Sequence, residues 1–339
     1  MSQPRRVLAL LHAHLVPPDN YAELTKEERE EFKAEADVLA ALETLGYEVR
    51  VVPLENELLV LRRAIEEFQP DVAFNLIEEF HGSTIYDQNV VSYLELMKVP
   101  YTGCNPRGLV IGRDKALSKQ ILSYHRIRVP TFGVFRKGCA IRKPARLRFP
   151  LIVKSLTEDA SAGIAEASVV QNEEKLVERV EFVHRNLETH AIAEEFIGGR
   201  ELYVGVFGHH RVTVLPTQEL FMKNLRPDAP RVFTLRAKWD LEFQKEREIG
   251  VGGAEDWSDE QEAKIARLAR RIYRALHLSG YARLDFRLDA SGRPCFLEAN
   301  PNPDIGADAE LALAAKAAGI PFEELIRRII NLGLRSLAE

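Results

Sequence analysis

The chain has 339 residues, of which 46% are hydrophobic and 29% charged, a balance typical of a soluble globular protein with two or three sub-domains. Its net charge of −5 argues against nucleic acid as a partner. Three cysteines, scattered without metal-ligand spacing, fit a reducing compartment, and no apolar run is long enough to span a membrane, so we expect a cytoplasmic protein without a membrane partner.

The first eighty residues alternate predicted strands and helices. Residues 6–11 predict a buried parallel strand and not a signal peptide, because His12 and His14 interrupt the apolar run and no small-residue cleavage site follows. A helix over 24–45, a strand over 48–53, a helix over 58–68 and a strand over 71–76 come next. This alternation favours an open α/β layer, but not a dinucleotide-binding one, since His12-Ala13-His14 stands where glycines are required.

The middle of the chain contains two stretches with features of a phosphate site. Asp114 is expected to cap a helix that begins near Lys115. The apolar strand predicted over 149–154 ends in Lys154, and an ammonium at the rim of a buried sheet is costly unless an anion lies near it. The loop over 158–164 follows, and its small residues let backbone N–H groups approach phosphates closely.

The next elements are mostly regular. A helix is expected over 176–187 and a strand over 191–197, which includes Glu194 and Glu195 and leads to two glycines. A hairpin over 202–207 and 211–215 places His209 and His210 in its turn, where they face different ways and do not form a metal pair. Helices over 260–276, with Ser258 or Asp259 as cap, and over 323–332 complete the chain.

The most informative element is a hairpin with strands over 282–288 and 294–300, joined by turn residues at 289–292. Period-two alternation places Leu284 and Leu297 on a covered face. The other face is expected to carry Arg283, Asp285, Arg287, Phe296, Glu298 and Asn300. Two carboxylates and an amide suit Mg²⁺, and the two arginines suit a grip on phosphate or carboxylate. The residues therefore predict a metal site, the alternative being a solvated sheet face with mixed charge.

The hairpin residues also carry a family resemblance. Arg283-x-Asp285-Phe286, Gly292 and Phe296-Leu297-Glu298-Ala299-Asn300-x-x-Pro303 resemble the metal-binding signature of the ATP-grasp superfamily, with the closest likeness to D-alanine–D-alanine ligases. The likeness spans about His81 to Pro303 with the motifs in order. It implies an α/β (α+β) ATP-grasp fold with an N-terminal open parallel α/β domain over 1–104, a lid subdomain over 105–193 and a C-terminal subdomain with the metal site over 194–339.

The resemblance implies an ATP-dependent enzyme that joins a small-molecule carboxylate to an amine through an acyl phosphate. Lys115, Lys154 and Lys238 would hold phosphates, and Arg283 would stabilise the oxyanion. Two Mg²⁺ ions, for which Mn²⁺ substitutes, would be held by Asp285, Glu298 and Asn300. Further ATP contacts would come from the lid loop and the adenine hinge: Ser161, Gly163, Glu194, Glu195, Phe196, Ile197 and Glu201. A homodimer follows only by analogy with dimeric ligases.

The substrate positions depart from the family pattern. A glutamate after the first strand, a lid serine, a loop tyrosine, a glycine and a later serine are replaced here by His12-Ala13-His14-Leu15-Val16, Ala160, Trp239, Asp304 and Ala309. A site built for hydrogen bonds loses on the order of 10⁴-fold in discrimination when they cannot form. We therefore expect that D-alanine is not the substrate.

Other functions stay open at this point. A kinase-like enzyme would stop at phosphoryl transfer. A nucleotide-binding module would bind ATP without turnover, but such a module would be expected to have lost a metal ligand, and the predicted set is complete. Asp304, Asp308 and Glu310 either attract a cationic or amine-bearing acceptor or form a capping cluster at a helix start.

Overall fold

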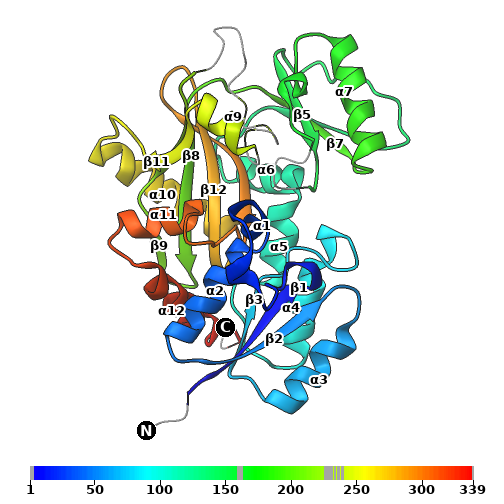
Figure 1. Ribbon diagram of the computed structural model, residues 1–339. Coiled ribbons are helices and arrows are strands. Elements are labelled where there is room, and N and C mark those ends of the chain that lie inside the picture. Colours follow the sequence, from blue (N-terminus) through cyan, green and yellow to red (C-terminus); the bar gives the residue numbers. More distant parts are fainter. Residues whose placement is uncertain are drawn as a thin grey trace.

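Three sheets organise the molecule, and Figure 1 traces them from the blue N-terminal strands to the orange hairpin. The computed structural model describes residues 4–158, 163–224, 232, 234, 237 and 240–337. Within these residues one sheet has three strands, one has four and one has six. The first is parallel and the other two are antiparallel, which confirms the mixed α/β (α+β) class.

The N-terminal sheet has the strand order β2-β1-β3. Its strands are β1 (Arg6–His12), β2 (Glu48–Leu54) and β3 (Val72–Asn75). Residues 7–11 are completely buried, as expected for the central strand of a parallel sheet that is covered on both faces. The helices α3 (Leu58–Phe68) and α4 (Asp87–Leu96) follow β2 and β3, so the predicted open parallel layer is confirmed.

The single helix predicted over 24–45 is wrong, because two helices occupy this stretch. The first, α1 (Lys26–Glu30), begins with a capping box in which the Thr25 hydroxyl accepts from Glu28 and the Glu28 carboxylate accepts from the Thr25 N–H. Phe32 has φ −105° and ψ 5°, outside helical values, and separates it from α2 (Lys33–Thr44). The apolar period continues through this break and therefore hides it.

The four-stranded sheet has the order β4-β7-β5-β6. Its strands are β4 (Phe132–Phe135), β5 (Leu151–Ser155), β6 (Val169–Val170) and β7 (Ala191–Glu195). The helix α7 (Glu173–Asn186) covers it and buries Leu176 and Val180 against Leu151 and Val153. The expected boundary between residues 193 and 194 falls inside β7, and the limits of the sub-domains stay a prediction.

Two further helices follow α4 and lead to the second sheet. The first, α5 (Pro106–Arg113), was not foreseen, and α6 (Lys115–Tyr124) follows it after one residue. Asp114 caps α6, as predicted, since its carboxylate accepts from the N–H groups of Ala116 and Leu117 at 2.9 and 2.8 Å. The cap fixes the helix start and thereby the position of Lys115.

The large sheet follows the path β11-β10-β8-β12-β13, with β9 beside β8. Its strands are β8 (Glu201–Gly208), β9 (Val212–Val214), β10 (Gln218–Met222), β11 (Ile249–Gly253), β12 (Gly280–Leu288) and β13 (Pro294–Pro301). The helices α9 (Leu241–Glu246) and α10 (Asp259–Ala275) flank it. Ser258 is the cap of α10.

A β-bulge corrects the predicted facing of the hairpin. Asp285 pairs with Glu298, but the register then shifts and Phe286 pairs with Phe296. The two rings meet edge to face in the core, with centroids 6.0 Å apart. The prediction that placed Phe296 on the site face and Leu297 on the opposite face is therefore wrong, since Leu297 lines the cavity described below. One extra residue reverses the facing of every residue beyond it.

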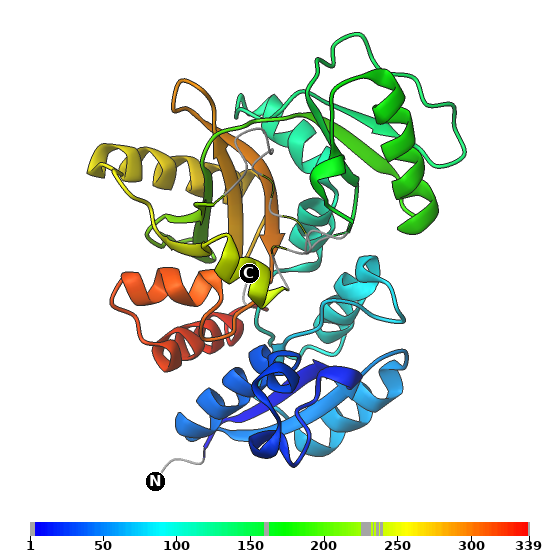
Figure 2. The ribbon, with the colours of Figure 1, turned by 45° about the horizontal axis from the view of Figure 1, so that its top comes forward.

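The C-terminal helices α11 (Glu310–Ala317) and α12 (Phe322–Gly333) return to the N-terminal sheet. Figure 2 shows these red helices beside the blue N-terminal part, on the side of the large sheet. One apolar cluster combines Val7 and Phe74 of the first sheet with Tyr281 of β12 and Ile326 of α12. The last part of the chain thus fixes two sheets against each other.

Gly280 shows how closely these parts pack. It has φ +66°, and a Cβ at this position would lie 2.1 Å from the backbone oxygen of Gly103. We predict that Gly280→Ala lowers the free energy of unfolding by at least about 3 kcal/mol, measured by urea denaturation, because the backbone cannot move aside. Gly319→Ala is the control, since Gly319 has φ +74° but nothing within 4 Å, and only about 1 kcal/mol is expected. Equal losses in both variants would contradict this.

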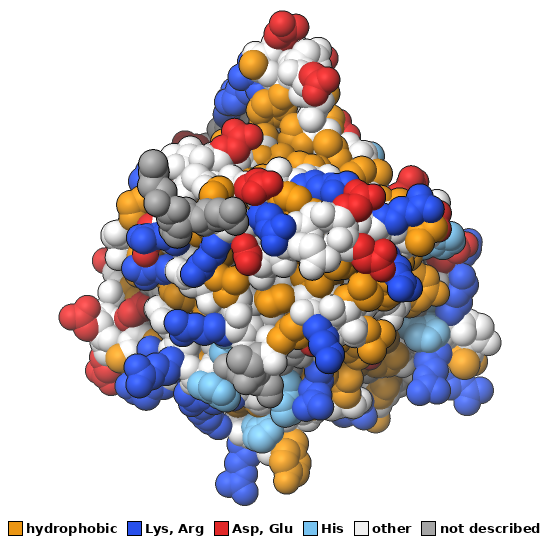
Figure 3. All heavy atoms as spheres, turned by 90° about the horizontal axis from the view of Figure 1, so that it is seen from below, with side chains coloured by type: hydrophobic (Ala, Val, Ile, Leu, Met, Phe, Trp, Pro, Cys, Tyr) orange, Lys and Arg blue, Asp and Glu red, His pale blue; other side chains and the backbone are white. Residues whose placement is uncertain are grey.

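Charges of both signs are interspersed over the face seen from below (Figure 3). Within the described residues, no helix combines the length and apolar character needed to cross a membrane. The buried charged side chains Lys154, Glu194 and Asp285 lie in the interior, where the sheets meet.

Candidate active site

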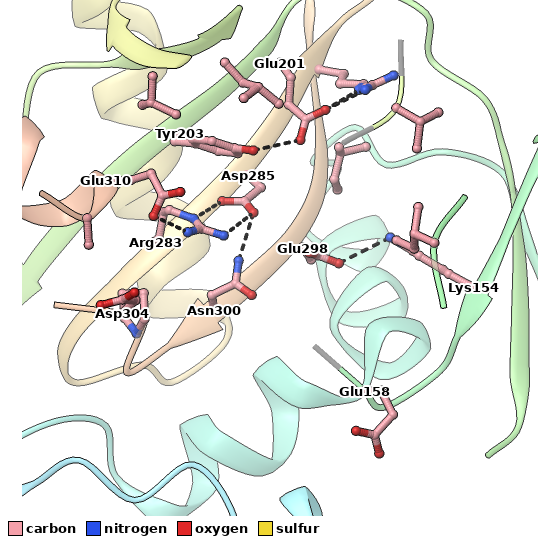
Figure 4. Close-up of a pocket in the computed structure, with 18 of the residues that line it drawn as sticks. Lys154, Glu158, Glu201, Tyr203, Arg283, Asp285, Glu298, Asn300, Asp304 and Glu310 are labelled. Carbon is pink, nitrogen blue, oxygen red and sulfur yellow. Dashed lines mark hydrogen bonds and ion pairs between the residues drawn. The ribbon is translucent and has the colours of Figure 1, made fainter. Parts of the chain in front are cut away.

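A cavity of about 810 Å³ lies between the three sheets, a volume suited to a ligand of nucleotide size. Its lining comes from the loop after β3, from β5 and β7, and from β8, β12 and β13. Figure 4 shows Arg283, Asp285 and Asn300 pointing toward one another, and Glu298 pointing toward Lys154.

The guanidinium of Arg283 lies between two carboxylates in this cavity (Figure 4). Its Nε and Nη2 donate to Asp285 at 2.9 and 3.1 Å, and its Nη1 donates to Glu310 at 2.9 Å. The Tyr203 ring centroid is 4.7 Å away. Burial works against the cation, but Asp285 and Glu310 raise the pKa of Arg283 well above its usual value, so its charge is permanent.

Asp285 is held from two sides. The side-chain amide of Asn300 donates to its Oδ2 at 2.9 Å, the same oxygen that accepts from Arg283 Nη2. Burial raises the pKa of Asp285 to about 6 in spite of the neighbouring guanidinium. The three side chains therefore have fixed orientations before any ligand binds.

Glu298 lies on β13, where it pairs with Asp285 of β12, and faces ammonium groups. The Lys154 Nζ is 3.3 Å from its Oε2 and the Lys115 Nζ is 3.8 Å away. Burial opposes its charge, but Lys154, Lys115 and Lys119 together hold the pKa of Glu298 below its usual range. The buried Lys154 thus does have an anion beside it, as its position at the strand end required.

Lys119 completes this network, and sequence reasoning missed it. It is fully buried, its Nζ lies 2.9 Å from Glu194, and it also donates to the Leu297 carbonyl. Glu194, which is 1% exposed, has Lys154 at 3.6 Å on its other oxygen. The spacing of four residues between Lys115 and Lys119 places both ammonium groups on one side of α6, and this is the signal that could have found it.

Arg287 occupies the other end of β12. Its Nε and Nη2 donate to Glu201 at 2.9 and 2.5 Å, and its Nη1 donates to the Ile197 carbonyl at 2.9 Å. The guanidinium carbon is 5.2 Å from the Phe196 ring centroid. Arg287 was expected to bind an anion, and the anion that it binds in the structure is the Glu201 carboxylate of the same chain.

The structure brings most of the predicted site residues together. Those that line the cavity are Lys154, Glu194, Glu195, Phe196, Ile197, Glu201, Arg283, Asp285, Glu298 and Asn300. Lys115 reaches them through Glu298, whereas Gly163 lies outside the lining and its carbonyl accepts from Arg179. Ser161 and Lys238 lie outside the described residues.

Two ion pairs of the cavity lining had no recognisable sequence signal, although Glu310 itself was expected either to attract a cationic acceptor or to belong to a capping cluster. Arg113 at the end of α5 pairs with Asp87 at 2.5 Å in the cavity wall, where Asp87 is buried and the Arg113 side chain is 11% exposed. Glu310, the partner of Arg283, is 27 positions away from it in the chain.

Comparison with known proteins identifies the family. A family model described as D-ala D-ala ligase C-terminus matches residues 121–331, more than half of the chain. The chain belongs to the D-alanine–D-alanine ligase family. An uncharacterized protein of Sinorhizobium fredii is 32% identical over 310 residues, which cover 88% of this chain and 86% of that one. A D-alanine–D-alanine ligase of Bordetella petrii is 33% identical over 254 residues, covering 74% and 73%.

Solved structures agree on the fold. The D-alanine–D-alanine ligase of Bacillus anthracis superposes with a TM-score of 0.77 at 23% identity, covering 98% of this chain and 99% of that one. The same enzyme complexed with ATP gives 0.76 at 24% identity with equal coverage. The ATP-grasp fold expected from the resemblance is thereby confirmed, and with it a place among the ATP-grasp ligases that form C–N bonds.

The structure describes some of the positions at which this chain departs from the family pattern. Asp304 and Ala309 line the cavity. At the end of β1, the His12 Nε2 lies 3.0 Å from Glu79, and burial lowers the pKa of His12. Ala160 and Trp239 lie outside the described residues.

The pKa of Glu35, in α2, reports the burial of this residue and the negative charge around it. This residue is 7% exposed, and burial together with the charges of Glu78 and Asp304 raises its pKa to about 7, compared with about 4.3 in an unfolded chain. Between these values the folded state binds the extra proton, so stability falls as the pH rises through this window. We predict that Glu35→Gln and the wild type have similar stability near pH 4.5.

At pH 8 the Glu35→Gln variant is expected to exceed the wild type by about 1–3 kcal/mol in free energy of unfolding. Urea denaturation at both pH values measures this difference. A difference that stays constant with pH would contradict the raised pKa of Glu35.

Proposed function

We propose that this chain is an ATP-dependent carboxylate–amine ligase that acts through an acyl phosphate on substrates other than D-alanine. The observation that carries the proposal is the gathering of Arg283, Asp285, Glu298 and Asn300 on one face of a hairpin, opposite Lys154. Membership of the ligase family supports ATP as the phosphoryl donor.

ATP would occupy the part of the cavity lined by β5, β7 and β8. Lys154 and Lys115 would hold its phosphates and Glu201 its ribose. The N–H groups of Glu195 and Phe196 donate to backbone oxygens at 2.9 and 3.0 Å. Among the described residues, the Ile197 N–H has no backbone partner, and we assign it to the nucleobase edge together with Glu194, whose carboxylate the two buried lysines keep in place.

The donor set of Asp285, Glu298 and Asn300 fits two Mg²⁺ ions. All three offer hard oxygen atoms, and the lysines keep Glu298 anionic. The described residues contain no group of three His, Cys, Asp or Glu that could hold a metal, so an amide and the ATP phosphates would complete the coordination. When bound, the ions would neutralise phosphate charge, and Mn²⁺ takes similar ligands.

The reaction requires positioning and charge stabilisation. A carboxylate oxygen attacks the γ-phosphorus, the bond to ADP breaks, and an acyl phosphate forms. The amine then attacks the carbonyl carbon and loses a proton, and phosphate leaves with one oxygen of the former carboxylate. Arg283, whose charge is permanent, would stabilise the developing oxyanion, and Lys154 would orient the transferred group.

The lining supports a substrate other than D-alanine. Asp304 and Ala309 replace the glycine and serine that the resemblance implies at these positions, and both line the cavity. Residues 12–16 offer no carboxylate for the first substrate's amine. Ligation of D-alanine is the second candidate, because the Bordetella petrii relative has that name.

The test is phosphate release from ATP and Mg²⁺ with a panel of carboxylates, each with and without pooled amines. Release that requires both a carboxylate and an amine is the expected result. Release with a carboxylate alone would favour either a kinase-like enzyme or an acyl phosphate that water hydrolyses, and rapid turnover of D-alanine alone would establish the second candidate. Intact ATP binding without release in any combination would favour the non-catalytic module.

A further inference from the structure

The loop between β4 and β5 carries a concentration of positive charge that the site does not use. Residues 136–148 contain six lysines and arginines and no aspartate or glutamate, in a chain whose net charge is −5. We call this segment the basic loop. All its cationic side chains are exposed except Lys143, which is half-buried. The cations are Arg136, Lys137, Arg142, Lys143, Arg146 and Arg148.

Within the part of the chain that the structure describes, none of these six cations forms an ion pair with a carboxylate. Arg146 and Lys143 donate instead to backbone carbonyls, at 2.9 and 3.1 Å. Exposed arginines on other helices do have acidic partners, since Arg62 and Arg328 lie 2.9 and 2.8 Å from glutamates. The charge of the basic loop is therefore not neutralised by neighbouring side chains and can attract an external anion.

The backbone of the basic loop is held in place by packing. Leu147 is 2% exposed within the apolar cluster that α7 forms with β5, and Ile141 packs against the same cluster. Two turns, over 136–139 and 144–147, are closed by backbone hydrogen bonds of 3.1 and 3.0 Å. The cations are thus presented from a fixed backbone, which lowers the entropic cost of binding.

The basic loop is separate from the candidate active site. It lies beside α7, at the end of the molecule away from the N-terminal sheet (Figures 1 and 2). None of its residues lines the cavity between the sheets. An inference about this loop therefore goes beyond the proposed function and does not depend on it.

The surroundings favour a short acidic peptide over an extended polyanion. Without the basic loop the chain is even more negative than −5, and a membrane or a nucleic-acid duplex would extend beyond the Debye length of about 10 Å and meet that charge. Residues 136–148 also expose no large apolar or aromatic side chain that could enter a bilayer or stack on a base.

The strand before the basic loop points to the same class of ligand. β4 is an edge strand, and the carbonyl of its Phe132 accepts from Arg146 of the loop and not from β7. Backbone groups alternate along a strand, so those of Val134, which is 37% exposed, face the same way. A peptide can pair with such an edge, whereas lipid headgroups and nucleic acid cannot.

We propose that the basic loop is a docking surface for an acidic segment of another protein, a run of aspartates and glutamates. The arginines of the loop would bind carboxylates through paired N–H groups, and the lysines would add charge without a fixed geometry. Because these contacts are exposed, the affinity is moderate and falls as salt is added.

The test is binding of the full chain to a labelled peptide of alternating aspartate and glutamate, about 12 residues long, measured by fluorescence anisotropy. The matched control is a peptide of alternating asparagine and glutamine. We expect a Kd below about 100 μM for the acidic peptide at low salt, at least about 10-fold weaker binding at about 0.3 M salt, and no measurable binding of the neutral peptide. Absence of binding by the acidic peptide, or equal binding of both peptides, would overturn the proposal.

Two triple variants locate the binding. The loop variant replaces three exposed arginines of the basic loop: Arg136→Gln, Arg142→Gln and Arg148→Gln. The control variant removes the same charge from arginines of α3 and α12 that pair with glutamates: Arg62→Gln, Arg327→Gln and Arg328→Gln. The loop variant should bind the acidic peptide at least about 10-fold more weakly, and the control variant within about 2-fold of the wild type. Equal affinities of the two variants would overturn the assignment to the basic loop.

Two other polyanions complete the experiment: vesicles that contain an anionic phospholipid, and a short DNA duplex. Both are compared with the peptide at equal concentrations of negative charge and equal salt. Weaker binding of both than of the acidic peptide is the expected result. Tighter binding of either one, lost in the loop variant, would overturn the acidic peptide as the ligand and assign the basic loop to a membrane or to nucleic acid.

Discussion

Glu298→Gln is expected to lower kcat by at least about 10³-fold while the fold stays intact. The substitution keeps the shape of the side chain but removes the carboxylate that faces Lys154 and Lys115. It also removes one of the proposed metal ligands. The two ammonium groups then lose the carboxylate that lies beside both of them. Transition-state charge would then be stabilised by groups that are no longer held in position.

Steady-state kinetics with the best substrate pair measures this effect, and titration with Mg²⁺ should show weaker metal binding. Glu178→Gln is the matched control, because Glu178 lies exposed on α7 and pairs with Lys175. We expect that variant to keep wild-type kcat. A Glu298→Gln enzyme with kcat within a few-fold of the wild type would contradict the proposed role of Glu298.

Lys119→Met is expected to lower the free energy of unfolding by about 3–5 kcal/mol. Lys119 is fully buried, and its loss leaves Glu194, also buried, with only Lys154 at 3.6 Å. Methionine has a similar volume, so the cost comes from an incompletely compensated buried charge and not from a cavity. Urea denaturation measures the loss.

The double variant Lys119→Met/Glu194→Gln separates pairing from packing. If the 2.9 Å pair is the source of the effect, the double variant should lose clearly less than the sum of the two single variants. Lys175→Met, at a lysine that is 58% exposed and paired with Glu178, should lose less than about 1 kcal/mol. Additive losses in the double variant would refute the coupling.

Local patterns predicted the elements that depend on local chemistry. The apolar run over 7–11 predicted the central parallel strand, because a strand covered on both faces cannot alternate. The turn at 289–292 and the cap at Asp114 follow from side chains that bond their own backbone. The period-two alternation of the hairpin was sufficient to place Asp285 and Glu298 on one face, where the structure pairs them.

The features that were missed depend on contacts between distant segments. The bulge that buries Phe296 arises from the core beneath the hairpin, and residue types alone do not mark it. The Arg283–Glu310 and Arg113–Asp87 pairs join residues that approach each other only after the sheets assemble. The packing of α12 on the N-terminal sheet likewise has no local signature, because an amphipathic helix does not specify its partner.

The most direct test of the ligase proposal is the fate of a labelled oxygen. The carboxylate substrate found in the phosphate-release panel would carry ¹⁸O in both carboxylate oxygens, and the released phosphate would be analysed by mass spectrometry. An acyl phosphate passes one carboxylate oxygen to phosphate when the amine displaces it, so we predict one ¹⁸O atom per phosphate released in the presence of the amine. Phosphate without label, formed at the same rate as ADP, would show that its new oxygen comes from water and would contradict the account.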